Sequence, residues 1–169
     1  VDAYVTVGLS AMNSIQESIN IAGRKNNEFL SILDFGCGYG RVLRHFKEFF
    51  PGADVQGADI NYDGPQFCKE HLGASEAHKS SEDFEIEFPK KYDLIFSGSL
   101  LTHLPETKAI EWFNKMDEIL ADNGILCFTT AGEFVFEGFS EVKPGGINKD
   151  EVPRIQESFK TRGFAYGNY

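Results

Sequence analysis

Short apolar segments alternate with helical patterns along this chain, and that alternation constrains the fold more than any other feature. Four segments are predicted to be buried strands: "SILDF", "ADVQGADI", "YDLIFSG" and "ILCFTTA". A shorter strand is expected near Ala77. Strands that alternate with helices predict a mostly parallel sheet covered on both faces, a doubly wound α/β fold of three layers. Ligands of such sheets bind beyond the carboxyl ends of the strands, so we expect the site in the loops that follow them.

The helical segments carry their own start and stop signals. Apolar residues recur at steps of three or four from Leu9 to Ala22, which predicts an amphipathic helix. Pro105 opens a long helical pattern that Asn123-Gly124 closes. A last helix is expected over residues 149–162, and "FAYGNY" (164–169) is predicted to start a further strand.

Length and composition bound the class of protein. A chain of 169 residues suits one domain, and its formal net charge of -10 argues against a nucleic-acid or anionic-membrane surface. The 3 cysteines are far apart, which disfavours a disulfide framework or a zinc site and favours a reducing compartment. No apolar run approaches the roughly 20 residues that span a bilayer. We therefore expect a single cytoplasmic domain that binds no metal, nucleic acid or membrane.

Three alternating glycines, Gly36, Gly38 and Gly40, stand between the first strand and a helical pattern. Glycine allows a positive φ and a close approach of the backbone to a ligand, and a helix N-terminus adds unpaired N–H groups. A plain tight turn is the alternative. A dinucleotide loop, G-x-G-x-x-G, would need glycine where Arg41 stands, and no Walker A sequence is present. A nicotinamide-dependent oxidoreductase is therefore disfavoured.

The remaining pattern, D-x-G-x-G-x-G from Asp34 to Gly40, resembles motif I of the class I S-adenosylmethionine-dependent methyltransferases, in particular small bacterial-type methyltransferase domains. Asp59 follows at the end of the second strand, where that family has an acidic residue. "DLIFSGSLLTHLPE" is similar to the family's fourth motif, and the resemblance is clearest over residues 31–130. It implies a Rossmann-like class I fold and S-adenosylmethionine as the cofactor.

The resemblance also implies roles for the residues of the glycine loop. In the family this loop, here Gly36, Cys37, Gly38 and Gly40, wraps the amino-acid end of the cofactor. The acidic residue before it, here Asp34, helps to hold the cofactor's ammonium group. Arg41 could reach the cofactor carboxylate; its alternative is a plain surface arginine.

Further positions follow from the later motifs. Asp59 would accept both ribose hydroxyls through its two oxygens, with a helix-capping aspartate as the alternative. Ile60 would pack on the adenine. Glu82 or Asp83 in "SSEDF" would read the adenine edge, unless this segment is a solvated acidic loop. Ser97, with Gly98, would lie near the methyl-bearing end.

Methyl transfer is an in-line displacement from a good leaving group, so positioning of the two reactants can supply much of the acceleration. A base is required only when the acceptor must lose a proton. His103, after the fourth strand, is the candidate base, since its reference pKa of about 6.5 suits the task. The alternative is a histidine that packs or caps the following helix.

The expected domain has three parts. Residues 1–30 form a helical lid segment, 31–130 the cofactor-binding core, and 131–148 an acceptor-side loop with Phe134, Phe136 and Phe139. We expect transfer of a methyl group to a small-molecule or glycan acceptor. The alternative is a catalytically silent cofactor-binding module or partner subunit with the same fold.

The end of the sheet departs from the family pattern. The family sheet usually continues to a sixth strand and a final antiparallel strand, whereas this chain stops at Tyr169. We therefore expect the final antiparallel strand to be lacking or truncated. An open strand edge invites pairing, which makes a homodimer one expectation.

Overall fold

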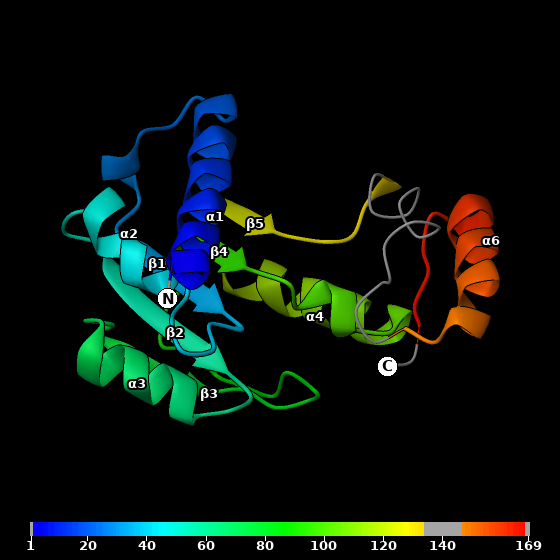
Figure 1. Cartoon of the computed structure of the whole chain (residues 1–169). Coiled ribbons are helices and arrows are strands. Elements are labelled where there is room, and N and C mark those ends of the chain that lie inside the picture. Colours follow the sequence, from blue (N-terminus) through cyan, green and yellow to red (C-terminus); the bar gives the residue numbers. More distant parts are fainter. Residues whose placement is uncertain (1, 134–146, 168–169) are drawn as a thin grey trace.

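The computed structural model describes residues 2–133 and 147–167 and is built around a parallel sheet (Figure 1). The strands are β1 (Ser31–Phe35), β2 (Asp54–Asp59), β3 (Glu76–Lys79), β4 (Tyr92–Ser97) and β5 (Leu120–Phe128). Their order is β3-β2-β1-β4-β5, and every neighbouring pair is parallel. The predicted doubly wound α/β fold is confirmed. The strand order reverses between β1 and β4, the place where open α/β sheets bind their ligands.

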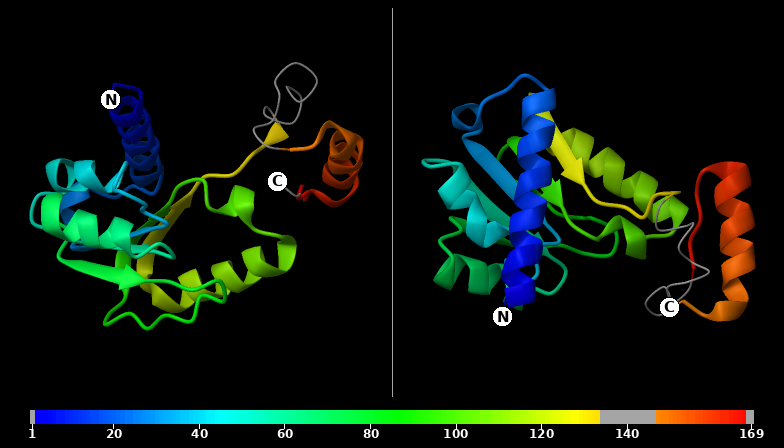
Figure 2. Two further views of the ribbon diagram at one scale, coloured as in Figure 1. Left: turned by 60° about the horizontal axis from the view of Figure 1, so that its bottom comes forward. Right: turned by 45° about the horizontal axis from the view of Figure 1, so that its top comes forward.

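Helices cover both faces of the sheet. The elements are α1 (Asp2–Ile21), η1 (Asn26–Glu28), α2 (Leu43–Phe49), α3 (Asp63–His71), η2 (Leu101–His103), α4 (Glu106–Ile119), η4 (Lys149–Glu151) and α6 (Val152–Arg162). The helices α1, α2 and α3 lie on one face and α4 on the other (Figure 2). Among the described residues, no helix is both long and apolar enough to cross a membrane.

The strand residues explain the two layers of helices. β1 buries Ile32 against α1 and α2, and its next residue, Leu33, against α4, so both faces of the strand are apolar. Met12, Ile15 and Ile19 of α1 are buried on the first side. Trp112 and Met116 of α4 are fully buried on the second, with Phe35 of β1. This packing fixes the carboxyl ends of the central strands, where the site lies.

The predicted end of the long helix was wrong. α4 ends at Ile119, and Leu120 already pairs with Tyr92 of β4, whereas the next aligned pair is Leu94 with Ile125. Residues 121–124 therefore form an irregular bulge in β5, and the Asn-Gly pair lies within it. The carbonyl of Asn123 accepts a hydrogen bond from Arg24 at 2.6 Å, so the bulge is held by the segment after α1.

The expected strand at "FAYGNY" was also wrong over residues 164–167, which are not in a strand. This segment runs back along α6, because Ser158 donates to the carbonyl of Phe164 at 2.8 Å and Arg154 to that of Tyr166 at 3.0 Å. The helix α6 lies away from the sheet, on the side to which the carboxyl ends of β4 and β5 point (Figure 1). Among the described residues no antiparallel strand joins β5.

Candidate functional site

The glycine loop connects β1 to α2 and owes its shape to left-handed backbone. Gly36, Gly38 and Gly40 have φ values of +79°, +49° and +72°, which side-chain-bearing residues rarely adopt. The N–H groups of Gly36 and Cys37 donate to the carbonyl of Ala58 at 2.7 and 3.1 Å. The alternation of glycines is thus a conformational requirement, and the loop is anchored to the end of β2.

The three glycines of the loop differ in what lies next to them: Gly40 packs against α3, whereas Gly36 and Gly38 face open space. A Cβ atom at Gly40 would lie 2.4 Å from Cδ1 of Leu72, so this position serves the packing of α3. A Cβ at Gly38 would meet nothing within 4 Å, and one at Gly36 would be 3.8 Å from Leu100. The first two glycines therefore leave open space beside the backbone, which is what a closely bound ligand needs.

Asp59 ties the glycine loop to the end of β2. Its Oδ2 accepts the N–H of Gly38 at 2.8 Å, and its Oδ1 accepts the N–H of Asn61 at 2.9 Å. A carboxylate has about four lone-pair positions, so each oxygen can accept a further hydrogen bond. The side chain also lines a cavity and can present those lone pairs to a ligand.

The first cavity lies at the carboxyl ends of β1 and β2 and has a volume of about 350 Å³. Its walls are mostly apolar, and its charged residues are Asp59, Glu82 and Lys108. Phe84 lies in this lining with a φ of +55° although it is bulky and buried, a strained conformation that is typical of functional sites. The lining residues are Phe35, Gly36, Asp59, Ile60, Ser80, Ser81, Glu82, Phe84, Leu100, Leu104 and Lys108.

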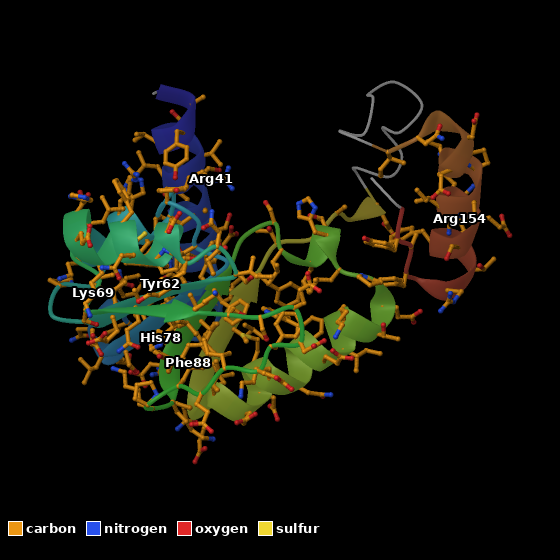
Figure 3. The ribbon with its side chains drawn as sticks, turned by 90° about the horizontal axis from the view of Figure 1, so that it is seen from below. Arg41, Tyr62, Lys69, His78, Phe88 and Arg154 are labelled. Carbon is orange, nitrogen blue, oxygen red and sulfur yellow. The ribbon has the colours of Figure 1, made fainter. Side chains whose placement is uncertain are left out.

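A second cavity of about 440 Å³ lies between the glycine loop and the start of α1. It is lined by Tyr4, Gly36, Cys37, Gly38, Tyr39, Arg41, Arg44 and Phe67. Gly36 belongs to both linings, so the two cavities adjoin at the first residue of the glycine loop. Figure 3 shows Arg41 close to α1, on the opposite side of the molecule from Arg154 of α6.

Two predicted residues at the glycine loop, Asp34 and Cys37, are buried. Asp34 is buried and lines neither cavity; its carboxylate accepts the N–H of Leu43 at the start of α2. Burial raises the pKa of Asp34 to about 7, although the Leu43 N–H and nearby Arg41 act in the opposite direction. A hydrogen bond with Cys68, together with burial, raises the pKa of the Cys37 thiol above its usual range. Cys37 is thus a neutral part of the second cavity's wall.

The remaining predicted residues are distributed around the cavities. Glu82 lines the first cavity, whereas Asp83 is turned to the outside in an ion pair with Lys108 of α4. Ser97 is buried at the end of β4, and its Oγ has no hydrogen-bond partner among the described residues. His103 is exposed on η2 and lines neither cavity. The expected aromatic loop with Phe134, Phe136 and Phe139 lies outside the described residues.

The structure thus brings together Gly36, Cys37, Gly38, Asp59, Ile60 and Glu82 at the cavities. Several lining residues were missed in the sequence, among them Lys108 of α4 and Phe67 of α3. Arg44 was missed as well; it lies in α2, whereas Arg41 lies in the turn before that helix, and both line the second cavity.

A family model for a methyltransferase domain matches residues 33–126, more than half of the chain. The chain belongs to this methyltransferase family. The matched range contains the glycine loop, Asp59 and β4. The resemblance to methyltransferases that the sequence motifs indicated is thereby confirmed. The five-stranded parallel sheet is the core expected of a class I methyltransferase.

Curated relatives are methyltransferases too. A malonyl-[acyl-carrier protein] O-methyltransferase of Acetivibrio thermocellus is 26% identical over 143 residues, which cover 80% of this methyltransferase and 46% of that protein. A ubiquinone biosynthesis O-methyltransferase of Pseudomonas syringae is 29% identical over 105 residues, covering 59% and 41%. The chain spans about half the length of the curated relatives it matches.

Solved structures agree on the fold. An amino pentose methyltransferase from Micromonospora echinaspora superposes with a TM-score of 0.59 at 17% identity, covering 76% of this chain and 51% of that one. Identity this low carries information on the fold alone. The superposition confirms the Rossmann-like class I architecture.

Proposed function

We propose that this methyltransferase binds S-adenosylmethionine across the two adjoining cavities and transfers its methyl group to an oxygen of a small acceptor. The observation that carries the proposal is the meeting of two unlike cavities at Gly36. One is mostly apolar and contains Asp59; the other contains two arginines. A nucleoside joined to an amino acid has the same division into an adenosine part and a charged part.

The linings support a placement of each part of the cofactor. Ile60 and Phe84 offer apolar surface for the adenine, and Asp59 keeps lone pairs for the ribose hydroxyls. Glu82 is a better partner for the adenine edge than Asp83, because the carboxylate of Asp83 already pairs with Lys108. The amino-acid part would lie along Gly36 and Gly38, with Asp34 behind the loop as a buried negative charge.

The nature of the acceptor atom decides whether a base is needed. The curated relatives are O-methyltransferases, one type acting on malonyl-[acyl-carrier protein], and we extend oxygen as the acceptor atom to this chain. A carboxylate oxygen is already deprotonated at neutral pH, whereas a hydroxyl of a glycan or metabolite must lose a proton. His103 is the proposed base for the second case.

Replacement of His103 by asparagine separates these cases. With a hydroxyl acceptor we expect kcat to fall at least about 100-fold, since general base catalysis contributes about 10²–10⁴. With a carboxylate acceptor kcat should stay within a few-fold. The measurement is the initial rate of transfer from radiolabelled S-adenosylmethionine, with affinity for S-adenosylhomocysteine as the control, which should not change. A hydroxyl acceptor turned over normally by the variant would rule out His103 as the base.

The proposed function is tested by incubating the protein with labelled S-adenosylmethionine and a panel that includes malonyl-acyl carrier protein, small carboxylic acids and sugars. Methylation of one class at the oxygen supports the proposal. Binding of the cofactor without transfer to any acceptor in the panel favours the alternative of a silent cofactor-binding module. The single-domain organisation, the cytoplasmic location, the absence of nucleic-acid partners and the homodimer stay predictions.

A further inference from the structure

Two of the three cysteines lie together where the glycine loop meets α3. Cys37 follows the first glycine of the loop, and Cys68 is a buried residue of α3. Their Sγ atoms share one acceptor, the carbonyl oxygen of Gly38, at 3.4 and 3.7 Å. The two thiols are also hydrogen-bonded to each other. The fold therefore brings two free thiols that are distant in the sequence into contact within the candidate site.

Glycines on either side of the pair leave the space that the two sulfurs fill. A Cβ atom at Gly57 would lie 3.0 Å from Sγ of Cys37, and one at Gly40 would lie 2.8 Å from Sγ of Cys68. The sulfurs are thus held between the loop, β2 and α3. Formation of a disulfide needs only a short approach, from hydrogen-bond contact to about 2.0 Å, because the loop and α3 already pack against each other.

The pair can be reached from the second cavity. Cys37 belongs to the lining of that cavity, whereas Cys68 and the third cysteine, Cys127, are buried and line neither cavity. The hydrogen bond from Cys37 lowers the pKa of the Cys68 thiol, although burial acts in the opposite direction, and a lower pKa increases the thiolate fraction. A small oxidant that enters the cavity therefore meets a thiol whose neighbour can complete a disulfide.

We propose that Cys37 and Cys68 are a reversible dithiol–disulfide pair and that their oxidation weakens cofactor binding; the second part rests on the proposed function. Hydrogen peroxide transfers one oxygen atom to one thiol, giving a sulfenic acid and water, and the other thiol then displaces this oxygen as a second water. One S–S bond replaces two S–H bonds, and the peroxide takes up the two electrons and two protons that the thiols lose. A thiol reductant reverses the step.

Oxidation changes the glycine loop at its centre. A disulfide sulfur carries no hydrogen, so the carbonyl of Gly38 loses its thiol donors. The new bond also ties Cys37 to α3 and draws its side chain out of the cavity wall. Because the N–H of Gly38 donates to Asp59 at 2.8 Å, the change extends to the first cavity, which Asp59 lines. The reduced form is therefore the one that binds the cofactor.

The test compares wild type with Cys68→Ser, which cannot form the bond, and with Cys127→Ser as the matched control. Each protein is treated with hydrogen peroxide, mapped by peptide mass spectrometry without reduction, and titrated calorimetrically with S-adenosylhomocysteine. In wild type and Cys127→Ser we expect a cross-link between Cys37 and Cys68. Their affinity should fall at least about 10-fold, the effect of losing one good hydrogen bond, and dithiothreitol should restore it. Cys68→Ser should keep its affinity, because burial keeps the remaining Cys37 thiol neutral and slow to react.

Linkage gives a second measurement of the same coupling. If the disulfide weakens S-adenosylhomocysteine about 10-fold, saturating S-adenosylhomocysteine must disfavour the disulfide by the same factor. In glutathione buffers, the midpoint potential of the pair should therefore rise by about 30 mV when this ligand is added. An unchanged midpoint would contradict the coupling.

The outcomes separate the thiol pair from the function on which its effect rests. A wild-type protein that forms no cross-link between Cys37 and Cys68, or whose cross-link involves Cys127, overturns the pair. A cross-link that leaves affinity unchanged, or an equal loss of affinity in Cys68→Ser, overturns its effect on the cofactor. Failure of the reduced wild type to bind S-adenosylhomocysteine overturns the proposed function, and the mapping still tests the pair. Thermal unfolding shows that each variant folds.

Discussion

Replacing Asp34 with asparagine should make the protein more stable at pH 8 and weaken its binding of the cofactor. The wild-type carboxylate is buried, and its pKa of about 7 reports the cost of keeping it ionised there. Asparagine has the same shape and its Oδ1 can still accept the N–H of Leu43. We expect a gain of up to about 4 kcal/mol in the free energy of unfolding, or up to about 8–16 °C in Tm.

The pH dependence of this gain has a definite sign. The folded pKa of Asp34 lies above its unfolded value of about 3.9, so the folded state binds the proton more strongly. Wild type therefore loses stability as pH rises from about 4 to about 7, and the loss is complete above pH 7. The advantage of Asp34→Asn should be absent near pH 4 and largest at pH 8, in urea unfolding at several pH values.

Cofactor binding should change in the opposite direction. An ionised Asp34 behind the glycine loop favours the cofactor's ammonium group, so we expect S-adenosylhomocysteine to bind Asp34→Asn at least about 10-fold more weakly at pH 8. Wild-type affinity should fall as pH decreases below about 7 and Asp34 takes up its proton. A variant that is stabilised but binds with unchanged affinity would show that Asp34 takes no part in the site.

Substitution of Gly64 with alanine should disrupt the glycine loop, because the new side chain on α3 would clash with the backbone of Gly38. A Cβ atom there would lie 2.4 Å from the carbonyl oxygen and 2.7 Å from the carbonyl carbon of Gly38. Backbone atoms cannot rotate away, so α3 or the loop must move, at a cost of about 1–3 kcal/mol. Because Gly38 also donates to Asp59, the two ends of the cofactor site shift together. We expect S-adenosylhomocysteine affinity to fall at least about 10-fold.

Gly132→Ala is the matched control for this variant. Its Cβ would meet nothing within 4 Å and its φ is not in the left-handed region, so stability and affinity should stay at the wild-type level. Calorimetric titration and thermal unfolding of both variants give the comparison. If Gly64→Ala bound the cofactor as tightly as Gly132→Ala, the contact between α3 and the loop would have no role in shaping the site.

The order of strands and helices could be predicted because each element carries its own local pattern. "SILDF" and "YDLIFSG" are apolar runs of strand length, and both form central strands of the sheet. The end of α4 could not be predicted in the same way. An Asn-Gly pair is typical of turns in general, and here it lies in a bulge inside β5 and not at the end of the helix. Residues 164–167 follow α6 because its side chains bind their carbonyls, a contact that no local pattern indicates.

The residues of the site also divide into those that a local sequence pattern predicts and those that it does not. Gly36 and Asp59 could be predicted because Gly36 directly follows β1 and Asp59 is the last residue of β2, and the carboxyl ends of these strands lie side by side in the sheet. Lys108 and Phe67 line the cavities from helices α4 and α3, and no local sequence pattern indicates that they do so. The raised pKa of Asp34 and the left-handed backbone of Phe84 arise from tertiary burial, so neither can be read from the motif.

The most direct test of a single cofactor site across both cavities is a titration of the ¹⁵N-labelled protein with S-adenosylhomocysteine, followed through its backbone amide resonances. We expect one binding event in which the amide resonances of Gly36, Gly38 and Arg44 shift together with those of Ile60 and Ser81 at the same ligand concentrations. The nicotinamide dinucleotide NAD should shift none of them. Shifts confined to one cavity, or a response to NAD in place of S-adenosylhomocysteine, would contradict a single cofactor site across both cavities.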